Sequence, residues 1–495
     1  MKHLKKIVSL LLTAVMVLAM CIPVMADDAA TVATTYTITA PDNGHTYEIY
    51  QIFTGDYDPT AKNLSNIKWG INGTGTTGEA VDTTVLAALT AVNSKSNTEK
   101  LETIIGYVSL KNPVATIGGT VKTYSAVPGY YLIKDKDGSV SGNDAYTKYI
   151  VEVVADITIT PKADVPDFEK KIKDTNDTTG DTSGWQDSAD YDIGDQVPFK
   201  LEGTVASNYA DYKTYYFAFH DVEEPGLTFN VGSVKVYVNG NQITSGYQVV
   251  TDTTDGCTFE VVFENLKNIK AVEAGSKVTV EYTSLLNDQA VLGSHGNVNK
   301  AKLEFSNNPN NEQSGKPDKG ETPWDNVIVF TYKVVINKTN EKGAALTGAE
   351  FTLTKELSDG SKKTIAVVKS NEDTTFTFNG LDDGRYTLKE TQTPSGYNTI
   401  SDITFTVNAD HTITWDGTNR DSVLEKLNGN KVTGEINLTP DKTKGSLSAN
   451  VVNKKGSTLP STGGIGTTIF YVVGVVLMLG AGVLLITKRR MSAKH

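Results

Sequence analysis

The sequence predicts an all-β protein of tandem immunoglobulin-like β-sandwich domains, flanked by a processing segment at each end. Three observations favour this fold class. The region between the ends is rich in Thr, Val, Tyr and Phe, its length within the 495 residues suits about three domains, and turn pairs recur in it, such as Asn239-Gly240, Asn379-Gly380 and Asp383-Gly384. Asn-Gly and Asp-Gly favour tight hairpin turns, so we expect many short strands. One helical stretch is expected between Val81 and Leu110.

The first segment, residues 1–26, has the three parts of a secretory signal peptide. Lys2, Lys5 and Lys6 precede an apolar run from 7 to 22, and the segment closes on Ala26, the predicted cleavage position. An uncleaved membrane anchor and a lipoprotein attached at Cys21 are the alternatives. The lipoprotein reading is disfavoured because Met20 stands where such signals have Gly, Ala or Ser.

The last segment predicts a membrane anchor. An apolar run covers residues 465–486, and the tail 487–495 contains Lys488, Arg489 and Arg490. About 20 apolar residues can span a bilayer, and a basic cluster holds the tail in the cytoplasm. A buried core helix is the alternative, but such flanks at a chain terminus disfavour it.

Charge and histidine placement argue against several classes of function. Removing residues 1–26 and 463–495 takes away seven of the 46 Lys and Arg and no acid, so the formal net charge moves from −12 to −19. An acidic surface excludes a nucleic-acid partner, which would need a basic footprint. The histidines left are scattered without metal or triad spacing: His45, His220, His295 and His411. We therefore expect no turnover enzyme and no cofactor, and we predict no metal-ligating residues, while any bound metal ion is left open.

Cysteine usage leaves one thiol in the mature chain. Cys21 leaves with the signal peptide, so Cys257 remains and an intramolecular disulfide is impossible. Cys257 has no evident histidine partner in the sequence, and we expect it to act as a small buried hydrophobe. A secreted chain without disulfides must gain covalent stability from another kind of cross-link, or do without it.

Two boundaries divide the interior into three β-domains. The first is the Pro-flanked link 161–166, and the second lies in the polar segment 307–323, before a long strand predicted from Val327 to Lys338. The predicted domains are 27–164, 165–331 and 332–457.

A sorting motif at 459–463 precedes the apolar span, and it reads Leu459-Pro460-Ser461-Thr462-Gly463. Motif, span and basic tail together resemble the cell-wall sorting signal of Gram-positive bacteria. The resemblance implies a sortase, of the pilus type or the housekeeping type, whose Cys attacks the Thr462–Gly463 bond and holds Thr462 until an amine resolves the thioester. The membrane span would keep the substrate beside the enzyme and raise its effective concentration.

The stretch from Val153 to Lys162 resembles the pilin motif that supplies such an amine. The motif has Trp, three variable residues, Val-x-Val and then Tyr-Pro-Lys. Ile157, Ile159, Pro161 and Lys162 fit, whereas Val153 replaces the Trp and Thr160 the Tyr. Strand parity places the two isoleucines inward and Lys162 outward, so we predict Lys162 as the intersubunit acceptor. An ordinary surface lysine is the alternative.

The third domain carries the residues of an internal cross-link. Residues 386–397 resemble the pilin E-box with one departure, at Thr393, and residues 346–353 resemble early strands of the collagen-adhesin B repeat. In that family a lysine near the first strand and an asparagine near the last form an isopeptide bond assisted by an acid. The matching positions are Lys338, Asn453 and Glu390. Strand parity places each of them on an apolar face, where a lone charge would be costly.

The middle domain repeats this pattern. Parity places Lys170, Asp221 and Asn307 on apolar faces, and residues 221–229 look like the pilin strand-turn whose Asp assists the reaction. We predict a Lys170–Asn307 bond with Asp221 as the assisting acid, since burial would leave a neutral amine facing a protonated carboxyl. Three strand-end residues with solvated heads are the alternative for both domains. No bond is predicted in the first domain, where the alignment puts Lys134 at the acid position.

Taken together, the motifs resemble a sortase-assembled Gram-positive pilin, the major fimbrial subunit, with collagen-adhesin A-type and B-type sandwich domains. The resemblance implies a shaft subunit of a cell-surface pilus, secreted and finally anchored to peptidoglycan. Its implied partners are sortase, other copies of itself, accessory pilins and peptidoglycan. A singly anchored adhesin is the main alternative, a basal or tip pilin is another, and a host-surface ligand is left open.

Overall fold

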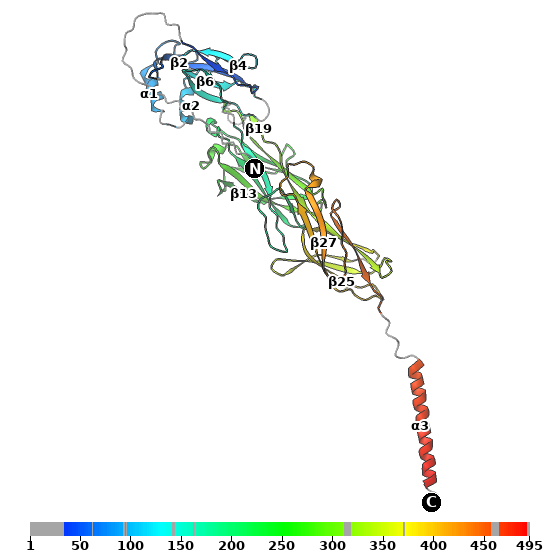
Figure 1. Cartoon of the computed structure of the whole chain (residues 1–495). Helices are drawn as coiled ribbons and strands as arrows, with labels where there is room; N and C mark the ends of the chain where they lie inside the picture. The colour runs from blue at the N-terminus through cyan, green and yellow to red at the C-terminus, as the bar shows by residue number, and fades with distance from the viewer. Residues whose placement is uncertain are drawn as a thin grey trace.

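The computed structural model describes residues 34–61, 63–92, 95, 97–140, 144–161, 164–310, 318–369, 372–456 and 465–492. Three β-sandwiches follow one another along an elongated molecule, and a single helix stands at the far end (Figure 1). The predicted all-β tandem sandwich fold is confirmed. The signal peptide and its cleavage position Ala26 lie outside the described residues.

The first domain pairs a larger sheet with a small one. The larger sheet has the order β3-β2-β6-β7, with β4 beside β2, and the small sheet has the order β5-β1-β8. Its strands are β1 Tyr36–Thr39, β2 Thr46–Asp58, β3 Asn63–Trp69, β4 Ala115–Gly118, β5 Thr123–Ala126, β6 Gly129–Asp135, β7 Lys148–Val153 and β8 Ile157–Thr158.

The helical stretch expected in this domain is two short helices, α1 Thr83–Ala91 and α2 Asn97–Ile105. Asp82 caps α1 because its side chain accepts hydrogen bonds from the backbone N–H groups of Thr84 and Val85. The helices pack on one face of the larger sheet through a core that includes Leu89 and Ile104, while the small sheet covers the other face.

The middle domain is a sandwich of two long sheets. One has the order β10-β20-β18-β12-β16-β15 with β19 beside β18, and the other β14-β13-β17-β11-β9. Its elements are β9 Asp167–Ile172, β10 Ser188–Asp190, β11 Gln196–Thr204, η1 Tyr209–Asp211, β12 Phe217–Glu223, β13 Leu227–Val238, β14 Asn241–Ile243, β15 Gln248–Val250, β16 Phe259–Phe263, η2 Leu266–Asn268, β17 Lys277–Leu286, β18 Asn297–Ser306, β19 Lys319–Glu321 and β20 Asp325–Phe330.

The third domain packs the sheet β24-β21-β29-β28 against the sheet β23-β22-β25-β26-β27. Its elements are β21 Tyr332–Asn340, β22 Glu350–Glu356, β23 Lys362–Lys369, β24 Thr375–Leu381, β25 Gly384–Gln392, β26 Ile403–His411, η3 Arg420–Ser422, β27 Leu424–Thr433, β28 Thr439–Asp441 and β29 Ser446–Asn453. The first strand, β21, and the last, β29, lie side by side and run parallel.

The junction between the middle and third domains differs from the expected polar linker. The segment 307–323 contributes β19 to the middle domain, and the chain crosses at Thr331, between β20 and β21. Alternate side chains of β20 enter different cores, because neighbouring residues of a strand face opposite sides. Val327 and Val329 pack in the middle core, whereas Ile328 and Phe330 pack in the third.

Candidate functional site

The three residues predicted for the third domain meet inside its sandwich. Lys338 on β21 pairs in register with Val451, two residues before Asn453 on the parallel strand β29. Lys338 Nζ lies within hydrogen-bond distance of Asn453 Oδ1. Glu390 reaches across from β25 in the facing sheet, where its Oε2 accepts a hydrogen bond from Asn453 Nδ2 at 3.0 Å. Its Oε1 lies 3.3 Å from Lys338 Nζ.

Burial decides the electrostatics of this cluster. Lys338 and Asn453 have no exposed surface, and Glu390 is 4% exposed. Burial lowers the pKa of Lys338, and the nearby Glu390 offsets this only in part. The backbone N–H of Ile400 donates to Glu390 Oε2 at 3.1 Å and fixes the carboxyl against the amide. The arrangement favours a neutral amine aimed at an amide that a carboxyl polarises.

A matching cluster lies in the middle domain. Lys170 Nζ on β9 donates to Asp221 Oδ2 on β12 at 2.5 Å and to Tyr282 Oη on β17 at 2.7 Å. Tyr282 Oη donates in turn to Asp221 Oδ2 at 2.7 Å. Asn299 on β18 donates from Nδ2 to the same Tyr282 oxygen at 2.9 Å. An amine, a carboxyl and an amide thus converge on one phenol, and all four residues are buried.

Burial also decides the electrostatics of the middle-domain cluster. Burial lowers the pKa of Lys170 and raises that of Asp221, and the attraction between the two groups offsets only part of each shift. Glu223, beside Asn299 Nδ2 at 3.3 Å, has its pKa raised to about 8 by burial and then by the charge of Asp221. Lys170 and Asp221 therefore favour the neutral amine and the protonated acid.

The prediction that Asn307 faces Lys170 is wrong. The Asn307 side chain instead donates to the backbone oxygen of Asp144 at 3.3 Å, and its own backbone oxygen accepts from Tyr146 at 2.7 Å, both in the first domain. Asn299 and Asn307 have the same parity, so they share a face of the strand. Eight residues of strand separate them by about 26 Å, however, and parity carries no information about position along a strand.

The remaining predicted residues stand as follows. Lys134 is buried in the first domain and pairs with Glu48 at 3.1 Å. Ile159 is buried and Ile157 packs on the same core, as the parity argument predicts, but Lys162 lies outside the described residues. Residues 459–463, Leu459, Pro460, Ser461, Thr462 and Gly463, also lie outside them.

The C-terminal segment forms the helix α3, Ile465–Ser492. Its part from Ile469 to Arg489 is long and apolar enough to cross a membrane, and this part is solvent-exposed along its length. It stands clear of the three sandwiches in Figure 1, as a membrane anchor would.

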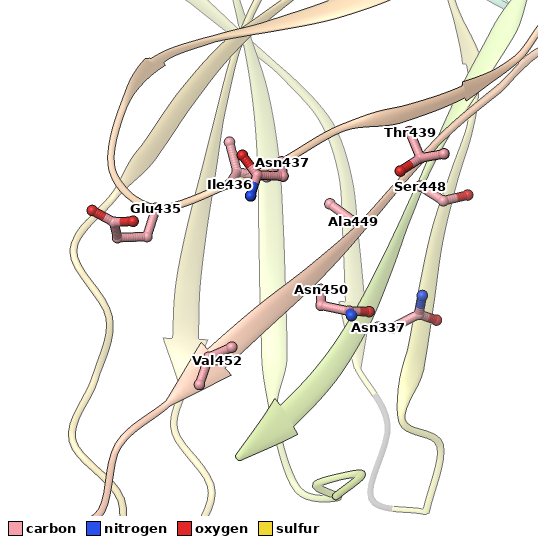
Figure 2. Close-up of a pocket in the computed structure, with 9 residues that line it drawn as sticks. All are labelled: Asn337, Glu435, Ile436, Asn437, Thr439, Ser448, Ala449, Asn450 and Val452. Carbon is pink, nitrogen blue, oxygen red and sulfur yellow. The ribbon is translucent and has the colours of Figure 1, made fainter. Parts of the chain in front are cut away.

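A polar hollow of about 600 Å³ lies on the outer side of β21 and β29, and Figure 2 shows the residues that line it. Asn337 and Asn450, which pair in register, point to this side, whereas their neighbours Lys338 and Val451 point into the core. The cross-linking residues therefore lie on the far side of the strands from this hollow.

Sequence reasoning missed other buried polar residues. Lys355 on β22 has no exposed surface and contacts three acids at the junction of the middle and third domains: Asp177, Asp192 and Asp382. Lys355 shares parity with Phe351 and Leu353, so the signal was present. Cys257 is buried, as expected, but its Sγ lies 3.7 Å from His220 Nδ1, a neighbour that was not evident in the sequence.

Tandem β-sandwiches ahead of a terminal apolar helix define a class of extended surface protein. The family described as the LPXTG cell wall anchor motif matches residues 451–492, which confirms the predicted sorting signal and places the chain at the cell wall. The prealbumin-like fold domain family matches residues 332–421.

Relatives are similar over nearly the whole chain. The trypsin-resistant surface T6 protein of Streptococcus pyogenes serotype M6 is 25% identical, over 92% of this chain and 94% of its own length. The solved T6 backbone pilin of the same serotype is 20% identical with a TM-score of 0.49, covering 88% of this chain and 100% of its own. The full-length major pilin SpaD of Corynebacterium diphtheriae is 17% identical with a TM-score of 0.45, covering 87% and 100%.

Proposed function

We propose that this chain is the repeating shaft subunit of a covalently polymerised pilus. Sortase joins Thr462 of one copy to Lys162 of the next and finally joins the polymer to peptidoglycan. The combination of two findings supports the proposal. The chain combines a cell wall anchor over residues 451–492 with similarity over 92% of its length to the T6 surface protein, whose solved structure is described as a backbone pilin.

The third domain forms an internal isopeptide bond between Lys338 and Asn453 in this proposal. The neutral amine of Lys338 attacks the side-chain amide carbon of Asn453, and Glu390 passes a proton to the departing nitrogen, which leaves as ammonia. One amide replaces another, so no oxidant or energy source is needed. The contacts of Lys338 and Glu390 with opposite ends of the Asn453 amide support this route.

In the middle domain the proposed bond joins Lys170 to Asn299, with Asp221 as the assisting acid. Tyr282 holds all three groups through its hydroxyl. Lys170 comes from one sheet of the sandwich and Asn299 from the other, so this bond would staple the two sheets together. The third-domain bond differs, because it would join neighbouring strands of one sheet.

These positions suit a subunit that transmits tension. Force entering at Lys162 reaches β9 of the middle domain first, and the Lys170 bond passes it to β18, which is hydrogen-bonded to the exit strand β20. In the third domain the entry strand β21 and the exit strand β29 would be joined directly by the Lys338 bond. Most of each sandwich is then bypassed by covalent structure.

A denaturing gel of cell-wall extract tests the polymer. The wild type should give a high-mass ladder, and Lys162→Arg should abolish the ladder while leaving the monomer secreted and folded. Arg keeps the charge but stays protonated and is a poor nucleophile. Lys136→Arg, an exposed lysine of the same domain, is the matched control and should keep the ladder. A single band from the wild type would instead favour a singly anchored adhesin.

A further inference from the structure

A second polar cluster lies on the outer face of the middle domain. His220 of β12 pairs in register with Glu260 of β16, and its side chain projects from the face opposite to Asp221. The turn before β16 brings Asp255 and Cys257 back over this face, where Asp255 Oδ1 accepts a hydrogen bond from the Cys257 backbone N–H at 3.0 Å.

The donor atoms of His220, Asp255 and Cys257 are spaced as ligands of one ion, and Glu260 lies beside them. Asp255 Oδ2 lies 3.0 Å from His220 Nδ1 and 3.1 Å from Cys257 Sγ. Cys257 Sγ lies 3.7 Å from His220 Nδ1, and Glu260 Oε1 lies 3.6 Å from the same nitrogen. Ligands of a tetrahedral zinc ion, at bonds of about 2.0–2.3 Å, lie about 3.3–3.8 Å apart. His220, Asp255 and Cys257 provide three corners of such a shell, and a rotation of the Glu260 side chain toward the ion would provide the fourth.

The surroundings of His220 match those of a metal-binding imidazole. Its second nitrogen, Nε2, lies 3.4 Å from Glu304 Oε2, and Glu304 is itself paired with Lys319 at 2.9 Å. Metal-bound histidines commonly hold a carboxylate at the nitrogen that faces away from the ion, which fixes the ring and its tautomer. His220 is 7% exposed and Cys257 9% exposed, while Asp255 lies on the exposed turn through which an ion could reach the site.

The charge around the cluster is negative. Asp255, Glu260 and Glu304 gather beside His220, and Lys319 pairs with only one of these carboxylates. Lys302 is directed to Glu321 at 2.6 Å. A divalent cation at the centre would offset the carboxylates that the lysines leave uncompensated.

We propose that His220, Asp255, Cys257 and Glu260 bind one Zn²⁺ ion. A sulfur and an imidazole nitrogen disfavour Ca²⁺ and Mg²⁺, and a mixed sulfur, nitrogen and oxygen set suits zinc. The Cys257 thiol releases its proton to solvent as the Zn–S bond forms. Four protein ligands fill the shell, so the ion is structural: it fastens the turn 251–258 to the sheet and shields the thiol from oxidation. This inference does not depend on the pilus proposal.

Cobalt substitution tests the site directly. The full chain, purified reduced and metal-free in detergent, is titrated with Co²⁺ and then with Zn²⁺. We expect one equivalent of Co²⁺, a near-ultraviolet thiolate-to-cobalt band, and loss of that band when Zn²⁺ displaces Co²⁺. Cys257→Ser should remove the band and weaken zinc binding more than about 100-fold, whereas Glu304→Gln should keep the band and weaken binding about 10- to 100-fold.

Control variants distinguish a specific zinc site from non-specific metal binding. His295→Gln changes an exposed histidine of the same domain and should leave both affinity and spectrum unchanged. If Cys257→Ser fails to fold, Asp255→Asn on the exposed turn gives the same test and should weaken zinc binding at least tenfold, as loss of a metal-site partner does. A cobalt spectrum without the thiolate band overturns the proposal. So does zinc affinity that is unchanged in Cys257→Ser or Asp255→Asn.

Discussion

At the scale of single residues, each proposed cross-link depends on one carboxyl group that touches the amide or the amine. Glu390 is hydrogen-bonded to the Asn453 amide in the third domain, and Asp221 is hydrogen-bonded to the Lys170 amine in the middle domain. Both acids lie among apolar side chains, where an unpaired charge would cost several kcal/mol. In the middle domain, burial favours a neutral Lys170 amine beside a protonated Asp221, which is the combination the reaction needs.

Glu390→Gln should prevent the third-domain bond, because an amide cannot relay the proton to departing ammonia. The intact mass of the wild type should be lower than the processed sequence by two ammonia molecules, and the variant by one. Residues 338 and 453 are 115 positions apart. If the cross-link restricts the unfolded chain as a disulfide does, its loss lowers the free energy of unfolding by about 4–5 kcal/mol. Glu435→Gln, on the outer side shown in Figure 2, is the control and should keep both deficits.

Two asparagines with the same strand parity, Asn299 and Asn307, are candidates for the middle-domain bond. Asn299→Ala should remove one ammonia deficit, because Asn299 shares the Tyr282 hydroxyl with Lys170. Asn307→Ala should keep both deficits, since its side chain lies at the junction with the first domain. Mass spectrometry of a tryptic digest should find one branched peptide that contains Lys170 and Asn299. A branched peptide that contains Asn307 would count against the assignment.

At the scale of elements, two features hold the joint between the middle and third domains. One is the strand crossing at β20, whose side chains enter both cores, and the other is a side-chain clasp between Arg420 and Glu224. Arg420 of η3 forms a two-pronged pair with Glu224, with both N–O distances 2.8 Å. It also donates to the backbone oxygens of His295 at 2.7 Å and Gly296 at 2.9 Å. The planar guanidinium suits this geometry, which a lysine cannot reproduce.

Arg420→Lys should therefore loosen this joint by about 1 kcal/mol, a modest value because the pair is partly exposed and solvent screens it. Calorimetry should show the unfolding transitions of the two domains moving apart. Arg385→Lys, whose side chain pairs with Glu356 inside the third domain, is the control and should leave the transitions together. Transitions that stay together in Arg420→Lys would show that the strand crossing alone couples the domains.

The same clasp should weaken in acid. Burial tends to raise the pKa of Glu224, but the hydrogen bonds from Arg420 and the Val298 backbone N–H, together with the charge of Arg420, outweigh it, so the pKa is lowered from its ordinary 4.5. A lowered folded pKa gives stability that is present above 4.5 and is lost as pH falls through the folded value. The separation of the two transitions should thus widen below about pH 4 in the wild type and change less in Arg420→Lys.

At the scale of the whole molecule, the terminal helix and the sorting motif determine whether the protein stays in the membrane or is attached to the cell wall. Thr462→Ala should leave the protein folded but held in the membrane, because the bond that sortase cleaves is lost. Muralytic enzymes should then release neither monomer nor ladder. Ser461→Ala, at the variable position of the motif, is the control and should be released normally. Release of the Thr462 variant would mean that another bond is cleaved.

Much of this arrangement followed from strand parity. Alternation placed Lys170, Lys338 and Glu390 on inward faces, and all three are buried. Parity failed where position along a strand mattered, as Asn307 shows. It also could not foresee the neighbours of His220, because the turn that carries Cys257 is brought over the sheet by folding, not by sequence spacing.

The sequence by itself determined the class of fold, the C-terminal sorting signal with its apolar anchor and the inward faces of the strands. Each of these depends on local composition or on a period of two residues, which the chain carries in linear form. Only the tertiary structure decided which residues meet across the sandwich: Asn299 and Tyr282 with Lys170, Lys355 with three acids of the joint, and His220 with Cys257. Such meetings depend on register between strands far apart in sequence, which is fixed when the sheets pack together.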